Sequence, residues 1–214
     1  MNSRFLLVLL VLLPLAAHAN RPSSAVAPVE GVDYQVIADG KPFAPLNGKV
    51  EVVEVFGYTC IHCARFQPQI DAWKQQQPAD VRFTAVPAAF GGLWIPYARA
   101  YLAAQKLGLL GKTHSAMFKA LHEDRSLPIQ NASTQEIAAF YAGYGADAKV
   151  FAATMEGAEV DAQLAGARQF AVASGVEGTP SMIVNGKYRV TARDFTAALR
   201  TTDYLVARER ARRR

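Results

Sequence analysis

Cysteine is scarce in this chain, and that scarcity narrows the chemistry available to it. Of 214 residues only Cys60 and Cys63 are cysteines, both in the stretch YTCIHC. A framework of disulfides between distant segments is therefore excluded. Structural zinc is disfavoured as well, because it needs four ligands, and the eight-residue spacing of the downstream histidines His114 and His122 matches no common ligand pattern. We expect no metal site, and we expect these two histidines to be surface residues or hydrogen-bonded core residues.

Long apolar runs are also missing, apart from one near the start. Phe5–Leu15 spans eleven residues, whereas a membrane-spanning helix needs roughly twenty. Arg4 before the run and Ala17-His18-Ala19 after it complete the pattern of a secretory signal peptide. We therefore predict a signal peptide over residues 1–19, cleaved after Ala19, in preference to a retained anchor helix. The Pro-, Ser- and Ala-rich residues 20–31 then form the flexible leader of an exported protein.

The chain has no strong excess of either charge, with 23 basic and 18 acidic residues. Five arginines nevertheless fall within residues 208–214, which we assign as a basic tail. Such a cluster can bind nucleic acid or an anionic membrane. It can also be a solvated, fraying helix end, where positive charge suits the helix dipole. Export makes nucleic acid implausible as a partner, so we expect the solvated helix end.

Two valine-rich segments with a helical pattern between them give the first indication of the fold. KVEVVEVFGY (49–58) and DVRFTAVPA (80–88) are typical of strands, the first apolar enough to be covered on both faces. Residues 60–77 predict a helix, with Thr59 as its N-cap and Pro68 inside it. Strand–helix–strand favours a right-handed parallel crossover, and hence the α/β class.

From Trp94 to about Gly175 the sequence has hardly any strand pattern. Alanine-rich segments predict five helices there, over residues 96–107, 109–123, 134–144, 147–156 and 160–175. Ser133 and Glu136 form a capping box at the start of one of them. SMIVNGKYRV (181–190) then predicts a hairpin that turns at Asn185-Gly186, and a last helix begins near Asp194.

The cysteine pair is open to two functions, a structural staple or a redox centre. As a staple it would close so short a loop that it removes only roughly 2 kcal/mol of unfolded-state entropy. As a redox centre it is well placed, because Cys60 falls in the first turn of a helix, where unpaired N–H groups and the positive dipole end favour a thiolate. His62 adds a donor or a positive charge near the same sulfur, and Cys63 lies one turn deeper. We therefore expect Cys60 to exchange with partners and Cys63 to resolve.

Together these features resemble the thioredoxin fold: a strand, a C-x-x-C motif at a helix start, a proline in that helix, and Gly-x-Pro before a later strand. VEGTPSMIVNGKY (176–188) is similar to the segment that carries the cis-proline loop of that fold. The resemblance implies that Pro180 is cis and packs opposite the cysteines. It also implies that Thr179 offers backbone hydrogen bonds to a bound substrate strand.

Spacing narrows the resemblance to one family. Cys63 and Pro180 are 117 positions apart, whereas a bare thioredoxin fold needs about 45 residues there. The surplus coincides with the all-helical stretch, and a thioredoxin fold with an inserted all-helical domain resembles the DsbA family of bacterial periplasmic dithiol oxidases. WIPYARAYLAAQKLG and THSAMFKALHEDR extend the resemblance, which covers about residues 34–208. We accordingly assign a discontinuous thioredoxin-like domain to residues 32–92 and 160–207, and the inserted helical domain to residues 93–159.

The resemblance implies a function, a location and partners. The protein would oxidise dithiols of unfolded exported client proteins in the periplasm by exchange with a Cys60–Cys63 disulfide, and a DsbB-like membrane quinone reductase would reoxidise it. It would be a monomer, without a bound cofactor and without nucleic acid as a partner. Glu54 takes the position of an acidic residue near the buried cysteine, where burial would raise its pKa and let it handle protons for Cys63. The alternative is an edge-facing carboxylate paired with Lys49 or another cation.

Two departures from the family pattern concern redox tuning and substrate contact. Ile61 stands where the best-known family motif has proline, and Thr179 stands where the family often has valine. Two other functions therefore stay open: a dithiol reductant or isomerase of the same fold, and a non-catalytic peptide-binding chaperone module. Apolar residues near the domain junction could hold client peptides or belong to the core: Phe90, Leu93 and Trp94.

Overall fold

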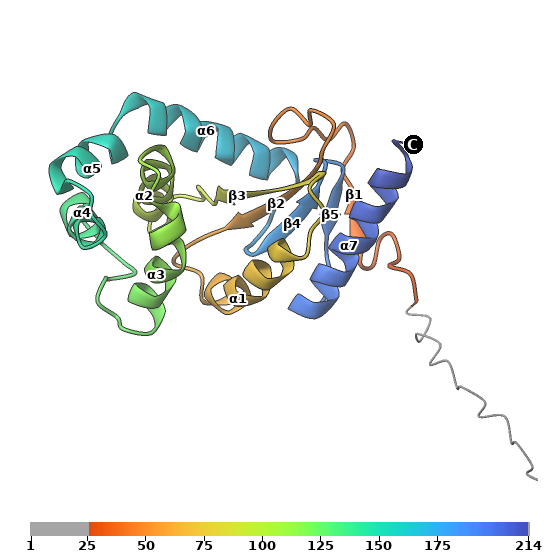
Figure 1. Ribbon diagram of the computed structural model, residues 1–214, viewed down its shortest axis with the longest axis horizontal. Helices are drawn as coiled ribbons and strands as arrows, with labels where there is room; N and C mark the ends of the chain where they lie inside the picture. Colours follow the sequence, from red (N-terminus) through yellow and green to blue (C-terminus); the bar gives the residue numbers. More distant parts are fainter. Residues whose placement is uncertain (1–25, 214) are drawn as a thin grey trace, which may run out of the picture.

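A five-stranded sheet forms the centre of residues 26–213, the part of the chain that the computed structural model describes (Figure 1). The predicted signal peptide, its cleavage site and the first residues of the leader lie outside this part. The strands are β1 (Tyr34–Val36), β2 (Val50–Phe56), β3 (Val81–Pro87), β4 (Ser181–Val184) and β5 (Tyr188–Val190). The helices are α1 (Ile61–Gln75), α2 (Trp94–Lys106), α3 (Leu110–His122), α4 (Thr134–Ala142), α5 (Ala148–Met155), α6 (Ala158–Ala173) and α7 (Phe195–Ala211). Within the described residues no helix is long and apolar enough to cross a membrane.

The strands lie in the order β1-β5-β4-β2-β3, and only the β2–β3 pair is parallel. The predicted strand–helix–strand crossover is therefore confirmed. All seven residues of β2 are buried, as the continuous apolar pattern predicted. In the register of β2, Glu54 stands opposite Ala85 on β3 and Met182 on β4. The thioredoxin-like architecture is thus assembled around a strand with neighbours on both sides.

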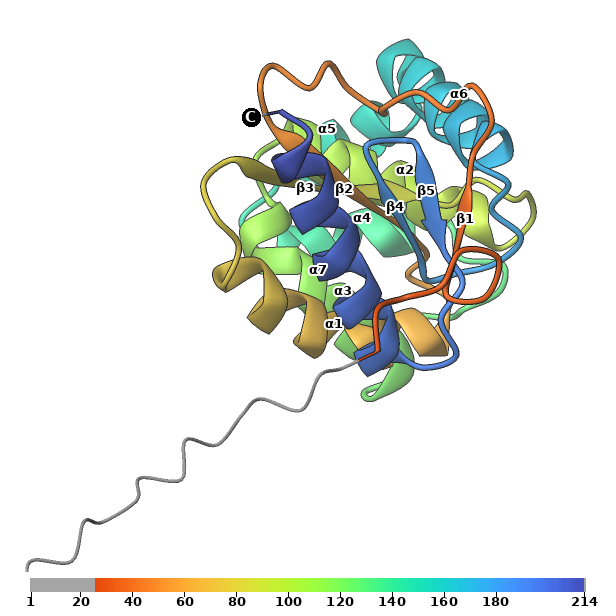
Figure 2. The ribbon, with the colours of Figure 1, turned by 90° about the vertical axis from the view of Figure 1, so that its right-hand side faces the viewer.

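Helices cover both faces of the sheet (Figures 1 and 2). On one face Val52 packs with Phe66 of α1 and Leu205 of α7. On the other face Val53 packs with Phe170 of α6. Alternate residues of β2 therefore point into two separate apolar layers, and its two carboxylates, Glu51 and Glu54, are buried along with its apolar side chains.

The helical region packs against the end of the sheet where β2 meets α1. Its core, formed by α2 to α5, also contains Phe56, Tyr58 and Cys63. Helix α6 joins both parts, because Val160 near its start belongs to this core and Phe170 near its end packs on the sheet. The assigned domain boundary at residue 160 thus falls within one continuous helix, and the division into domains stays a prediction.

Two local motifs form as predicted. The Ser133 hydroxyl accepts a hydrogen bond from the Glu136 N–H at 3.1 Å, and the Glu136 carboxylate accepts one from the Ser133 N–H at 2.9 Å, so the capping box is confirmed. The hairpin between β4 and β5 turns at Asn185 and Gly186, both with positive φ. Gly186 is required there, since a Cβ would lie 1.9 Å from the Lys41 carbonyl oxygen.

The predicted N-cap of the first long helix is wrong by one residue. The N-cap of α1 is Cys60, whose N–H bonds to the Gly57 carbonyl at 3.0 Å. Thr59 lies inside the resulting turn, and its hydroxyl has no hydrogen-bond partner among residues 26–213. The tight turn that closes on Gly57 therefore overrides the capping preference of threonine.

The expected solvated, fraying C-terminal end is only partly right, because residues 211–213 are exposed but the helix does not fray before Ala211. Helix α7 continues to Ala211, and its arginines are held: Arg208 donates to the Tyr34 hydroxyl at 2.9 Å, Arg210 to the Asp80 carboxylate at 2.7 Å, and Arg212 to the Tyr188 hydroxyl at 2.8 Å. These contacts hold the last turn of α7 against β1, β5 and the start of β3, while Arg212 and Arg213 stay exposed to water.

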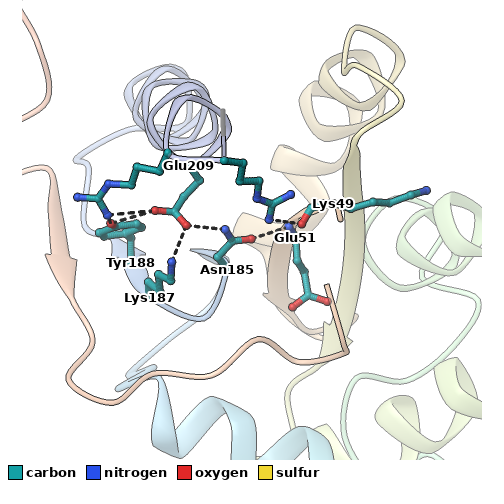
Figure 3. A network of polar contacts seen from close by, with 8 residues as sticks. Lys49, Glu51, Asn185, Lys187, Tyr188 and Glu209 are labelled. Carbon is teal, nitrogen blue, oxygen red and sulfur yellow. Dashed lines mark hydrogen bonds and ion pairs between the residues drawn. The ribbon is translucent and has the colours of Figure 1, made fainter. Parts of the chain in front are cut away.

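A polar network centred on Glu209 fixes the same end of the molecule (Figure 3). Glu209 is buried and accepts hydrogen bonds from Asn185 at 2.7 Å and Lys187 at 2.8 Å. The Asn185 side chain in turn accepts from the N–H of Glu51 at 2.8 Å. One side chain of the hairpin turn therefore connects α7 to the central strand.

Candidate active site

The two cysteines lie where β2 ends and α1 begins. Cys60 has extended backbone angles at the N-cap, and Cys63 lies in the first turn of the helix. The turn before them is packed against α2, because a Cβ at Gly57 would lie only 2.1 Å from the Trp94 ring. The absence of a side chain at Gly57 thus lets the helical region approach the cysteine turn closely.

Cys60 is half-buried, and its environment favours the thiolate. Its thiol donates a hydrogen bond to the Thr179 carbonyl at 3.4 Å. A hydrogen bond from Cys63 contributes most to lowering the pKa of Cys60, from an ordinary 9.0 to about 5, against the opposing effect of burial. The Thr179 side chain and the backbone N–H groups of Cys63 and His62 lower it further. These N–H groups are the unpaired donors of the helix start that the sequence predicted.

Cys63 has the opposite character. Only 1% of its surface is exposed. Burial raises its pKa well above the ordinary value, and the neighbouring Cys60 and Glu54 raise it further. The pair therefore combines an accessible thiol that ionises readily with a buried thiol that does not, one helical turn apart.

Glu54 lies in the middle of β2 with 1% of its surface exposed. Burial raises its pKa from 4.5 to about 8; Lys74 partly offsets this, while Asp71 and Cys60 add to it. The alternative of an edge-facing carboxylate paired with Lys49 is wrong, because β2 has a neighbour on each side. The carboxyl group is instead close enough to the cysteine pair for Glu54 to raise the pKa of Cys63 and for Cys60 to raise the pKa of Glu54.

The loop before β4 completes the surface around Cys60. The Thr179–Pro180 peptide bond is cis. Both residues line a small pocket of about 170 Å³, together with His62, Phe66 and Phe195. His62 is exposed and lines this pocket, and its backbone N–H faces Cys60. Ile61, also exposed at 39%, flanks the cysteine pair.

The three apolar residues assigned to a client groove or to the core differ in placement. Phe90 is 41% exposed, and its ring packs edge-on against Trp94 at 5.3 Å between ring centroids. Trp94 is partly buried against the sheet core, and Leu93 is half-buried. Of these three residues only Phe90 therefore exposes substantial apolar surface.

Sequence reasoning missed a set of polar contacts behind the cysteine turn. His114 bonds to the Tyr58 hydroxyl at 2.8 Å, and His122 bonds to the Tyr58 carbonyl at 2.7 Å. Of the two expectations for these histidines, surface residues or hydrogen-bonded core residues, the structure supports the second, but their common partner was not foreseen. A signal was present in the spacing of Cys63, Gln67 and Asp71, which repeats every four residues and places them on one face of α1.

This geometry supports thiol–disulfide exchange. A partner can reach Cys60 but not Cys63, a sulfur with a low pKa is a good leaving group, and a buried acid lies nearby. Glu54, Cys60 and Cys63 come together with Thr179 and Pro180, although these last two residues lie more than a hundred positions later in the sequence.

Comparison with known proteins points the same way. A family model described as the DSBA-like thioredoxin domain matches residues 94–200. The thiol:disulfide interchange protein DsbA of Pseudomonas aeruginosa is 35% identical over 208 residues, 96% of this chain and 97% of the relative. The protein of the same name from Azotobacter vinelandii is 40% identical over 167 residues, 77% of each chain. The crystal structure of the oxidoreductase DsbA from Xylella fastidiosa matches with a TM-score of 0.85 and 56% identity, over 86% of this chain and 98% of that one.

Proposed function

The chain belongs to the DsbA family of thiol:disulfide oxidoreductases, and from that premise we propose that Cys60 and Cys63 form its redox centre. In this proposal their disulfide oxidises pairs of thiols in exported proteins. The observation that carries it is the asymmetry of the pair. The pKa of half-buried Cys60 is lowered to about 5, whereas that of the buried Cys63 is raised.

In the first step a client thiolate attacks the sulfur of Cys60 in the Cys60–Cys63 disulfide. A bond forms between the client sulfur and Cys60, the bond between the two cysteines breaks, and Cys63 leaves as a thiolate. Attack at Cys60 is favoured because Cys63 has 1% of its surface exposed.

In the second step another thiolate of the client attacks the client sulfur of this mixed disulfide. The client disulfide forms, and Cys60 leaves as a thiolate. Because the pKa of Cys60 is about 5, this leaving group is stable at neutral pH and the step is favourable. The client has lost two electrons, and the cysteine pair has gained them.

Glu54 supplies a proton during the first step. The Cys63 thiolate is strongly disfavoured by burial, and Glu54 with a pKa of about 8 is largely protonated at neutral pH. We assign Glu54 to protonate Cys63 as it leaves, and to accept that proton again when the disulfide is reformed. The exchange itself needs only sulfur and protons, so the proposal includes no bound cofactor.

Substrate contact is assigned to the surface around the cis bond. The Thr179 backbone lies beside Cys60 and can pair with an extended client segment, as in other strand-addition contacts. Phe90 extends the apolar surface nearby. Ile61 and the His62 ring flank the sulfur and are proposed to tune its redox potential.

Location and partners follow from the family. We propose that the protein acts in the periplasm after removal of residues 1–19, that its clients are unfolded exported proteins, and that a DsbB-like membrane protein reoxidises it by passing the electrons to a quinone. The described residues are proposed to act as a monomer.

An equilibrium with glutathione tests the function. The disulfide form, mixed with reduced glutathione at known ratios, should be converted largely to the dithiol, and it should also restore disulfides in a reduced, unfolded test protein. A reduction potential below about −300 mV, as for structural disulfides, would contradict an oxidase.

Two single-cysteine variants test the roles within the pair. Reduced Cys63→Ser, mixed with a disulfide-containing client, should retain a mixed disulfide through Cys60. Cys60→Ser should retain none, because its remaining thiol is buried. Equal trapping by both variants would contradict the assigned order of attack.

A further inference from the structure

A buried chain of hydrogen bonds joins α3 to the helix that carries the cysteines. The Tyr58 hydroxyl lies 2.8 Å from His114 Nδ1, and His114 Nε2 lies 3.0 Å from Gln67 Oε1. The Gln67 amide nitrogen then donates to Asp71 at 3.0 Å. We call these four residues the Tyr58–Asp71 chain. The mechanism above uses none of them.

The donors in this chain all point the same way. Because the Gln67 amide nitrogen donates to Asp71, its oxygen can only accept, so the proton of His114 is on Nε2. His114 Nδ1 is then an acceptor for the Tyr58 hydroxyl. Burial lowers the pKa of His114 to about 4 and keeps the ring neutral, as this arrangement requires. Hydrogen bonds aligned in this way strengthen one another.

The chain holds the cysteine turn from both sides. Tyr58 comes two residues before Cys60, and its backbone carbonyl also accepts a hydrogen bond from His122 of α3 at 2.7 Å. Gln67 comes one turn after Cys63 and is only 4% exposed. Helix α3 is therefore connected to the segment before the pair and to the helix after it.

We propose that His114 is a positioning residue of the redox centre. Through Tyr58 it fixes the turn between β2 and α1, so that the Cys60 thiolate stays aligned with the N–H groups at the start of α1. The disulfide form depends on this alignment less, because the bond to Cys63 itself holds the Cys60 sulfur. Loss of the chain therefore destabilises the reduced form selectively. This inference rests on the proposed function of the cysteine pair.

Three substitutions test the proposal: His114→Leu, Tyr58→Phe and His114→Gln. His114→Leu should shift the glutathione equilibrium toward the disulfide by about three- to tenfold, the effect of roughly one hydrogen bond. Tyr58→Phe removes only one oxygen and should shift the glutathione equilibrium in the same direction, but less than His114→Leu does. His114→Gln keeps an acceptor and a donor and should restore part of the wild-type value. The thiolate absorbance of Cys60 should titrate at higher pH in each.

Measuring unfolding of both the reduced and the disulfide form distinguishes a role of His114 in positioning the Cys60 thiolate from a role in the stability of the fold alone. The free energy of unfolding should fall more for the reduced form of each variant than for its disulfide form. The difference between the two losses should equal the free energy that corresponds to the shift in the redox equilibrium. Tyr97→Phe is the matched control, since it removes a buried hydroxyl that bonds to the Pro128 carbonyl within the helical region. The control should leave the redox equilibrium at the wild-type value.

Equal stability losses in both redox states, with an unchanged equilibrium and an unchanged Cys60 titration, would show that the chain only supports the fold and would overturn the proposal. If His114→Leu does not fold, Tyr58→Phe decides by the same readouts. A wild-type protein that fails to exchange with glutathione would instead overturn the proposed function, and this inference with it.

Discussion

The thiol of Cys60 donates a hydrogen bond to the backbone carbonyl of Thr179, 3.4 Å away and 119 positions later in the chain. A carbonyl oxygen can only accept, so this contact exists with the protonated thiol and is lost when Cys60 ionises. Ionisation and disulfide formation therefore both free the Thr179 carbonyl. We infer that the freed carbonyl becomes available to the backbone of a client at the stage when the client sulfur must approach Cys60.

The reactivity of reduced Cys60 should follow an acidic titration. Its alkylation rate should rise with a midpoint near pH 5, against the ordinary thiol value of 9.0. Because the folded pKa is lowered, ionisation stabilises the reduced fold fully above pH 9.0, less as pH falls, and not at all below pH 5. As pH rises from 5 to 9.0, the free energy of unfolding of the reduced form should therefore increase relative to that of the disulfide form. A midpoint near 9 in the alkylation profile would contradict the low pKa.

Thr179→Val tests the contribution of the residue before the cis bond. The Thr179 hydroxyl is buried without a hydrogen-bond partner among residues 26–213 while Cys60 is a thiol, so it is free to donate to the Cys60 thiolate and lower its pKa, and valine keeps the shape while removing the hydroxyl. The titration midpoint of Cys60 should rise, and the glutathione equilibrium should shift toward the disulfide by about two- to fivefold. Thr196→Val, at an exposed position on α7, is the matched control. An equal effect of both substitutions would rule out a specific role of Thr179.

Replacing His62 by alanine should make the disulfide less oxidising, but only modestly. The His62 backbone N–H lowers the pKa of Cys60 and survives the substitution, whereas the exposed ring acts through solvent. We expect the glutathione equilibrium to shift by about two- to fivefold toward the disulfide. Gln69→Ala, exposed on the same helix, should leave it unchanged. A variant indistinguishable from wild type would remove the His62 ring from redox tuning.

Local sequence patterns predicted most of the elements and the position of the cysteine pair. The valine-rich residues 49–58 predicted the central strand, the Asn185-Gly186 pair predicted the hairpin, and Ser133 with Glu136 predicted the start of a helix. Each of these signals depends on residues within a few positions of one another, so no knowledge of the fold was needed to interpret them. The position of Cys60 at the start of α1 was likewise predicted from neighbouring residues alone.

What could not be predicted depends on contacts between distant segments. One error is local instead, since Cys60 rather than Thr59 caps α1 because a backbone turn closes from Cys60 to Gly57. The Arg208 and Arg210 side chains have partners on β1 and before β3, more than a hundred residues earlier. His114 gave no sequence signal of its own, because its partners Tyr58 and Gln67 become neighbours only when α3 packs on α1.

The buried Glu51 carboxylate makes a stability prediction far from the cysteines. It accepts hydrogen bonds from the Phe43 N–H at 2.7 Å and from Arg82 at 2.8 Å, and none of its surface is exposed. Arg82→Met leaves this carboxylate without its counter-charge and should lower the free energy of unfolding by about 3 kcal/mol. Denaturant unfolding measures the loss.

Arg82→Lys is the matched variant, since it keeps the charge but loses the further contacts of the guanidinium with the Pro45 and Ala44 carbonyls. It should lose less stability than Arg82→Met. Both variants should keep the wild-type glutathione equilibrium, because the site lies at the opposite end of β2 from Cys60. A shifted redox equilibrium would show that the two ends of the strand are coupled.

Glu54→Gln should stabilise the protein increasingly as pH rises. Burial raises the pKa of Glu54 from 4.5 to about 8, so the unfolded chain loses this proton at lower pH than the folded one. Between pH 4.5 and 8 the wild type therefore loses stability, by roughly 5 kcal/mol in total, and the neutral amide avoids this loss. The difference between variant and wild type should be constant below pH 4.5, grow up to pH 8 and then level off. Urea unfolding of the disulfide form measures it without interference from the cysteines. Glu156→Gln, at an exposed position, should show no such trend, and a difference independent of pH for Glu54→Gln would mean that Glu54 ionises normally and cannot hold a proton for Cys63.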